Sequence, residues 1–106
     1  RAAHRNLRRS LRRSDSASAR QQAFGAFLSA RSGEGEGAWI GRDLQPILVA
    51  YPAMAKVALA MAELDSAVWS SGSGHQASDG ELLALARTVE SLDLEVAANT
   101  LQGESR

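Results

Sequence analysis

Few side chains in this sequence have the type and spacing that catalysis or metal binding requires. The two histidines, His4 and His75, are far apart in the chain, and His4 lies among arginines, which oppose the binding of a cation. The sequence has no HExxH motif, no EF-hand spacing and no cysteine. We therefore expect no metal site, no cofactor and no enzymatic activity.

The carboxylates also lack the spacing of a catalytic pair. Glu63 and Asp65 are two residues apart, as are Asp93 and Glu95. Residues two apart on a helix point to different faces, so the members of each pair would not share one reaction centre. This arrangement agrees with the expectation of a protein that binds rather than catalyses.

A basic N-terminal segment is the most informative chemical feature of the chain. Residues 1–31 contain eight arginines and one aspartate, a net charge of +7, whereas residues 32–106 carry a net charge of −7. Such a concentration of one charge indicates an anionic partner. The arginines expected to bind that partner are Arg5, Arg8, Arg9, Arg12 and Arg13.

Three kinds of partner fit this segment. It could contact RNA phosphates with strong salt dependence, lie on an anionic membrane surface, or dock into an acidic groove of another protein or of its own body. Leu7 and Leu11 are a weak apolar anchor for a membrane, and no aromatic residue before Phe24 could stack on bases. Because the acidic remainder of the chain would repel nucleic acid, we favour docking to a protein.

The elements that must position these residues are predicted to be helices. No segment alternates convincingly between apolar and polar residues, so we expect an all-α protein. The clearest helix is predicted at 52–70. A second long helix is predicted at 79–101, where Ser78 and Glu81 have the spacing of a capping box. Shorter helices are expected within residues 1–13, 18–30 and 43–49.

The pattern of charge and glycine divides the chain into three parts. Residues 1–31 are expected to be a basic arm, extended or with short amphipathic helices, that cannot stay folded alone. Residues 32–38 are expected to be a flexible Gly/Glu linker, and residues 39–106 a helical body. We predict that this body is a small bundle built on an antiparallel hairpin of the two long helices, with no transmembrane segment.

Two further sets of residues are candidates for binding. The aromatic side chains of Trp39, Tyr51 and Trp69 are possible anchors for a partner. Asp65 and Asp93 occupy matching positions within the apolar faces of the two long helices, where an acid must reach water or a cation. We expect these two acids to receive arginines from the basic segment or from a partner.

Some of these features resemble a known family. Trp39 precedes a long helix, and a later helix carries Leu92-Asp93 and Ala97-Ala98, which is similar to the Q-type extrinsic subunit of photosystem II. The likeness covers residues 39–98 and implies a small four-helix lumenal protein. This chain departs from the family pattern in its arginine-rich segment.

The function predicted from these observations is that of a non-catalytic accessory or structural subunit of a larger multiprotein assembly. An energy-transducing complex of a mitochondrion or plastid is the expected setting, because the Arg- and Ser-rich N-terminal composition is typical of organellar transit peptides. The alternatives are an RNA-phosphate-contacting protein of a ribonucleoprotein such as a ribosome, and a subunit like the Q-type protein of photosystem II.

Overall fold

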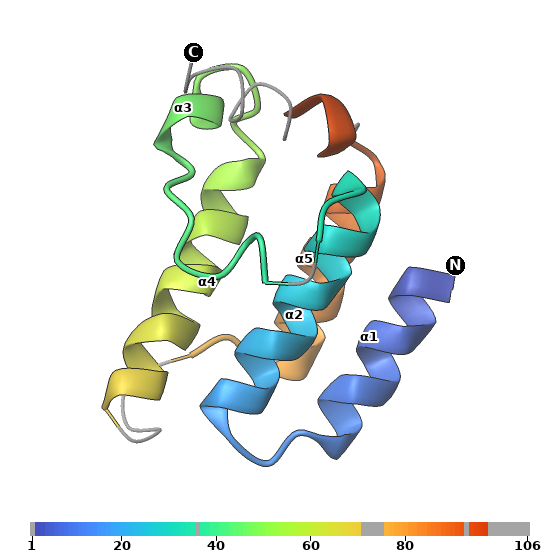
Figure 1. The fold of residues 1–106 in the computed structure, drawn as a ribbon, viewed down its shortest axis with the longest axis vertical. Helices are drawn as coiled ribbons and strands as arrows, with labels where there is room; N and C mark the ends of the chain where they lie inside the picture. The colour runs from blue at the N-terminus through green and yellow to red at the C-terminus, as the bar shows by residue number, and fades with distance from the viewer. Residues whose placement is uncertain (1, 36, 71–75, 93, 98–106) are drawn as a thin grey trace.

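The computed structural model describes residues 2–35, 37–70, 76–92 and 94–97. These residues contain no strand, so the prediction of an all-α protein is confirmed. The four longer helices pack around one hydrophobic core, and the short helix α3 contacts α4 near one end of the molecule (Figure 1). The helices are α1 (Ala2–Arg13), α2 (Ala17–Ser32), α3 (Gln45–Leu48), α4 (Met54–Trp69) and α5 (Asp79–Glu90).

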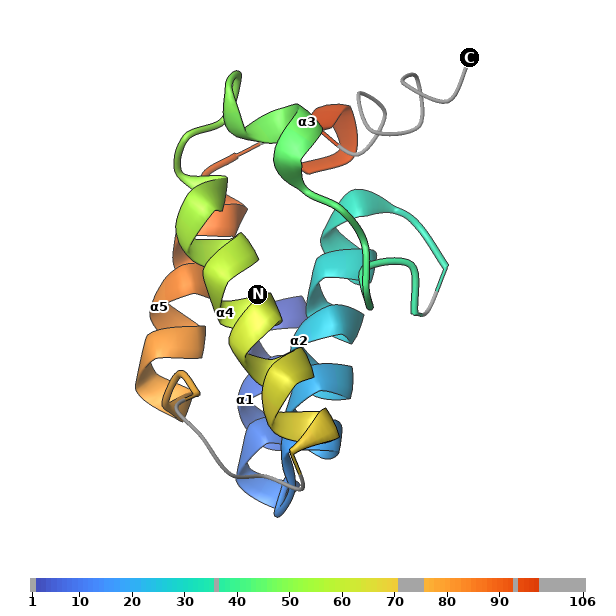
Figure 2. The same ribbon diagram turned by 90° about the vertical axis from the view of Figure 1, so that its left-hand side faces the viewer.

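Helix α2 is the central element of the fold. It contacts α1, α4 and α5, and in Figure 1 α1 and α4 lie on opposite sides of it. The view turned by 90° places α4 in front, between α5 and α2 (Figure 2). The sequence of α2 explains this position, because it contains no acid and nine of its 16 residues are buried. A helix with small and apolar residues on most of its surface can be covered on several sides.

The basic N-terminal segment belongs to this core. Leu7 and Leu11 of α1 are each 2% exposed, and they join one hydrophobic cluster with residues of α2, α4 and α5. These contacts attach the basic segment to the helices of residues 39–106, and the division of the chain into arm, linker and body stays a prediction. The apolar stripe of α1 is narrow, but α2 and α5 together cover it. Tertiary packing then stabilises a helix that would not persist alone.

The last predicted helix is shorter than expected. Helix α5 ends at Glu90, and the N–H of Ser91 donates to carbonyl oxygens of the preceding turn while its hydroxyl donates to Thr88 O at 2.6 Å. This serine competes for the backbone carbonyls that a continuing helix would use. A further helical turn follows at 94–97, and residues 98–101 of the predicted helix lie outside the described part. The predicted capping box of Ser78 and Glu81 is confirmed.

The Gly/Glu segment at 32–38 is a structured turn where it is described. Gly33 has φ +76° and ends α2 in the left-handed conformation, with its N–H donating to Ser29 O. The N–H of Glu34 also donates to Ser29 O, at 3.1 Å. Glycine adopts a positive φ without steric cost, which suits it to this C-terminal cap. Residues 33 and 34 thus form a capped turn, whereas the flexibility expected for 32–38 stays a prediction; residue 36 lies outside the described part.

The chain after this turn folds back onto α2. Trp39 is buried in the core, and Ile40 packs closely against α2 at Gly25. A Cβ atom on Gly25 would come within 2.8 Å of Ile40 Cδ1, so the glycine permits the close approach. Gly25 weakens α2 locally, but its lack of a side chain allows Ile40 to pack against this helix.

Candidate partner-binding surface

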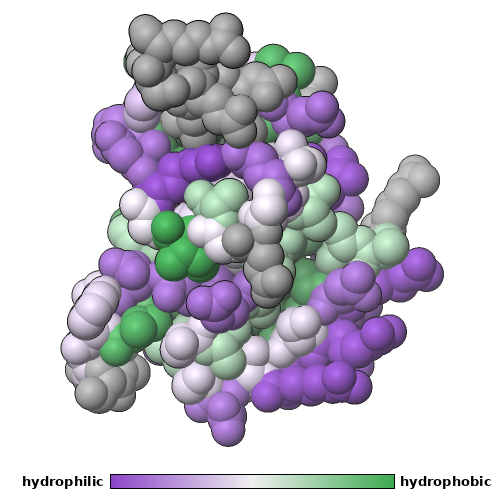
Figure 3. All heavy atoms as spheres, in the orientation of Figure 1, coloured by the Kyte–Doolittle hydropathy of each residue, from purple (hydrophilic) through white to green (hydrophobic). Residues whose placement is uncertain are grey.

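The exposed face of α1 is an array of positive charge. Its five described arginines are exposed, and none of them makes a hydrogen bond or ion pair with another described residue. The helix contains no acid. Figure 3 shows hydrophilic side chains gathered along the flank of the molecule where α1 lies. The residues of this arginine face are Arg5, Arg8, Arg9, Arg12 and Arg13.

Helical spacing assigns the arginines to different sides of α1. Arg13 lies nearly in line with Asn6, which lines the groove with α2, and Arg9, one turn before Arg13, lies at the middle of the exposed face, closer to that groove than Arg5 and Arg8 are. Arg8 follows the buried His4 by one turn and lies on the other side. The arginine face therefore has two edges, of which one adjoins α2.

The five arginine side chains surround a hollow of about 300 Å³ on the surface of α1. Like charges held this close repel one another unless an anion lies between them. Guanidinium groups bind carboxylates and phosphates with paired hydrogen bonds, so an anion in this hollow would contact several of them. The arrangement is suited to binding a polyanionic surface and has no group placed to act as a general acid or base.

The aromatic candidates have three different environments. Trp39 is 2% exposed and lies in the core, so the interpretation of Trp39 as a partner anchor is corrected. Tyr51 is half-buried and packs against the core. Trp69 is 83% exposed at the end of α4, where a partner could reach it.

Asp65, one of the two candidate buried acids, has a neutral hydrogen-bond partner. Asp65 is half-buried, and its Oδ1 accepts a hydrogen bond from Gln21 Nε2 at 3.0 Å. Gln21 is 5% exposed on α2. Asp65 therefore contacts a neutral amide where α2 meets α4, and an arginine from a partner protein stays a prediction for this carboxylate. Asp93 lies outside the described residues.

An ion pair that the sequence did not reveal stabilises the turn after α2. Arg42 donates to both carboxylate oxygens of Glu34, at 2.9 and 2.6 Å, and the two side chains are 18% and 10% exposed. The guanidinium of Arg42 also lies 4.7 Å from the centre of the Trp39 ring. The Ser32 hydroxyl accepts from Trp39 Nε1 at 3.0 Å and donates to Glu34 Oε1 at 2.8 Å. This cluster fixes the turn and the tryptophan together.

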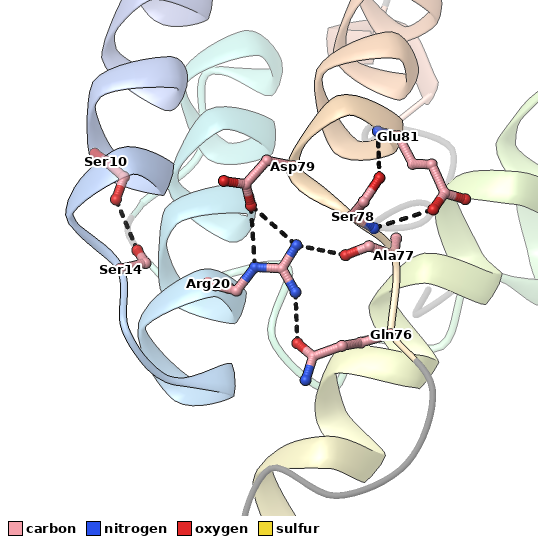
Figure 4. A network of polar contacts seen from close by, with 8 residues as sticks. All are labelled: Ser10, Ser14, Arg20, Gln76, Ala77, Ser78, Asp79 and Glu81. Atoms are coloured by element: carbon pink, nitrogen blue, oxygen red, sulfur yellow. Dashed lines mark hydrogen bonds and ion pairs between the residues drawn. The ribbon is translucent and has the colours of Figure 1, made fainter.

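Arg20 is the arginine of the basic segment that turns inward, and sequence reasoning missed its role. Its guanidinium donates to Asp79 Oδ1, to Gln76 Oε1 and to the carbonyl oxygen of Ala77 (Figure 4). These acceptors lie at the start of α5, so one side chain joins α2 to the N-terminus of α5. No local signal marks it, because its partners are more than fifty residues away in sequence.

Replacing Arg20 with alanine is expected to lower the free energy of unfolding by about 2 kcal/mol, because a buried acceptor would lose a charged donor. The side chain of Arg20 is 14% exposed, whereas Asp79 is 51% exposed, so the ion pair itself contributes little of this. Urea denaturation followed by circular dichroism measures the change. The matched control is Arg31→Ala, at an exposed position in the same helix. Equal stability of the two variants would contradict the structural role of Arg20.

The described residues contain no cluster of three histidine or acidic side chains that could hold a metal ion. Within the same residues, no helix combines the length and the apolar character that crossing a bilayer demands. No protein-family model matches the chain, and neither a curated protein nor a solved structure is significantly similar to it. The resemblance to the Q-type subunit of photosystem II therefore stays a prediction from the sequence.

Proposed function

We propose that this chain is a non-catalytic accessory subunit that docks onto an acidic surface of another protein through the arginine face of α1. The observation that carries the proposal is the placement of five exposed arginines on a helix whose opposite side is locked into the core. In this proposal, α2 and the hairpin of α4 and α5 are the scaffold that presents the face.

The burial of Leu7 and Leu11 gives the arginine face a fixed geometry before binding. A free arginine-rich peptide would lose conformational entropy when it folded on its partner, whereas α1 is already helical. A preformed array gains affinity for a surface whose acids have a matching arrangement. This favours a structured partner over a disordered anionic chain.

The distribution of the remaining charge favours a protein over nucleic acid. Residues 32–106 carry a net charge of −7, and exposed acids occur at the start of α5 and beside the turn before α3. A long polyanion laid across the molecule would meet these acids, whereas a protein surface with a local acidic patch can avoid them. The alternative of an RNA-phosphate-contacting protein is supported by the arginine face alone.

The organellar setting is part of the same proposal. Its support is the arginine- and serine-rich composition of residues 1–31. We propose a multiprotein complex of a mitochondrion or plastid as the assembly to which the subunit belongs.

Neutralising all five arginines as glutamine is expected to reduce the recovery of a specific protein partner at least tenfold, or about 1.4 kcal/mol. The measurement is affinity purification of the full chain from its native cells, with quantitative mass spectrometry. The control is Lys56→Gln with Arg87→Gln, which removes exposed cations on α4 and α5, away from the arginine face. Circular dichroism checks that each variant is folded.

The proposal is wrong if recovery of the partner is unaffected by the five substitutions. It is also wrong if ribonuclease treatment removes the Arg-dependent partners, since the arginine face would then bind RNA. Recovery that persists after ribonuclease and weakens with salt supports docking to an acidic protein.

A further inference from the structure

A shallow groove of about 130 Å³ lies between α1 and α2, along the edge of the arginine face. Its lining is small or apolar, with two neutral polar side chains: Ala3, Asn6, Leu7, Ser10, Ala23, Ala26, Phe27 and Ala30. We propose that this groove receives an acidic α-helix of the partner protein, an inference that rests on the proposed function and specifies the docking element.

The size of the lining residues allows a helix to approach closely. Ala26 and Ala30 are exposed and four residues apart on α2, so they form a row of methyl groups along the groove. Two packed helices have axes about 8–10 Å apart, and the distance depends on the side chains at the contact. A row of alanines permits the shorter distance between the axes. Side chains of the partner helix that flank the contact then come within reach of α1.

The charge around the groove selects an acidic helix. Arg9 and Arg13 lie on the α1 side, and the exposed Arg31 follows Ala30 in the last turn of α2. Neither α1 nor α2 contains an acid within its described residues. A helix with an apolar stripe would fill the groove, and carboxylates beside that stripe would meet guanidinium groups.

The spacing of the arginines favours a helical partner over an extended one. Arg9 and Arg13 are four residues apart, a rise of about 6.0 Å along the axis of an α-helix. Carboxylates four residues apart on a partner helix have the same repeat, so successive pairs can form in register. Residues on one side of a strand repeat at about 6.6–6.8 Å, a poorer match to this spacing. The apolar floor of the groove also offers few hydrogen-bond partners to a phosphate chain.

The test uses a stapled helical peptide of about 20 residues, longer than α1, with an Ala/Leu stripe flanked by glutamates. Its affinity for the full chain is measured by fluorescence anisotropy, and NMR chemical shifts map the contact. Two control peptides have the same composition: one distributes the glutamates around the helix, and one contains prolines that prevent helix formation. Single-stranded RNA and vesicles containing phosphatidylserine are tested in parallel.

Two pairs of variants separate the groove from general charge. Arg9→Gln with Arg13→Gln is expected to weaken peptide binding about tenfold. Arg5→Gln with Arg8→Gln removes the same charge and is expected to weaken peptide binding less than about threefold. Ala26→Met with Ala30→Met fills the groove and is expected to weaken binding about fivefold. Ala55→Met with Ala62→Met, at exposed positions on α4, is the control and leaves the affinity unchanged.

The outcomes distinguish this inference from the proposed function. Equal binding of the helical and proline-containing peptides, or an unchanged or tighter affinity after filling the groove, overturns the acidic helix in the groove while Arg-dependent binding of acidic protein stands. If RNA or vesicles bind through the arginines and no acidic peptide does, both the inference and the proposed function fail.

Discussion

Replacing Trp39 with alanine is expected to lower the free energy of unfolding by about 4 kcal/mol, among the largest effects of any single substitution in this chain. The side chain is 2% exposed, its ring contacts the core, and its Nε1 donates to Ser32 Oγ. Removing it leaves a large cavity and takes a donor from the Ser32 hydroxyl. The stacked guanidinium of Arg42 would also lose its contact. Urea denaturation followed by circular dichroism gives the change.

The chain provides a matched control for this substitution. Trp69 is 83% exposed, so Trp69→Ala should change the free energy of unfolding by no more than about 0.5 kcal/mol. A loss for Trp39→Ala as small as that expected for Trp69→Ala would mean that Trp39 is not part of the core. If Trp69→Ala instead reduces partner recovery while stability is unchanged, the prediction of Trp69 as a partner anchor is supported.

Replacing Leu7 with alanine is expected to lower the free energy of unfolding by about 3 kcal/mol. Leu7 lies in the arginine-rich helix but is 2% exposed, in one hydrophobic cluster with residues of α2, α4 and α5. Its truncation leaves a cavity under α1 and weakens the attachment of the whole helix. Thermal and urea unfolding of the full chain measure the loss.

The control for Leu7 is Leu59→Ala on α4, where the side chain is 60% exposed. We expect that variant to lie within about 0.5 kcal/mol of the parent. If Leu7→Ala were as stable as the parent, α1 would be an appendage, and the arginine face would lack the rigid support on which the proposed function depends.

Local sequence signals predicted the helices better than they predicted the packing. The long helix expected at 52–70 is α4, Met54–Trp69, and the Ser78–Glu81 capping box starts α5 as expected. Both depend on residues within a few positions of one another. The end of α5 was missed because no glycine or proline marks it; the stop depends on Ser91 and on the turn that follows.

The place of α1 in the core could not be read from its own residues. Its apolar stripe is too narrow to stabilise a lone helix, and the decisive contribution comes from α2 and α5. The same holds for Arg20 and for the hydrogen bond of Gln21 with Asp65, since their partners are distant in sequence. In contrast, Arg42 and Glu34 are only eight residues apart. Gly33, which follows α2 and precedes Trp39, is a local signal that the chain turns back after α2.

The contact of α1 with α5 has a consequence for biosynthesis. Helix α1 is synthesised before α5 and packs against it, so the apolar stripe of α1 stays partly uncovered until α5 has been made. Contacts between residues so far apart are among the slower ones to form in a small protein. The nascent chain therefore exposes part of a cationic amphipathic helix to its surroundings until α5 has emerged to cover it.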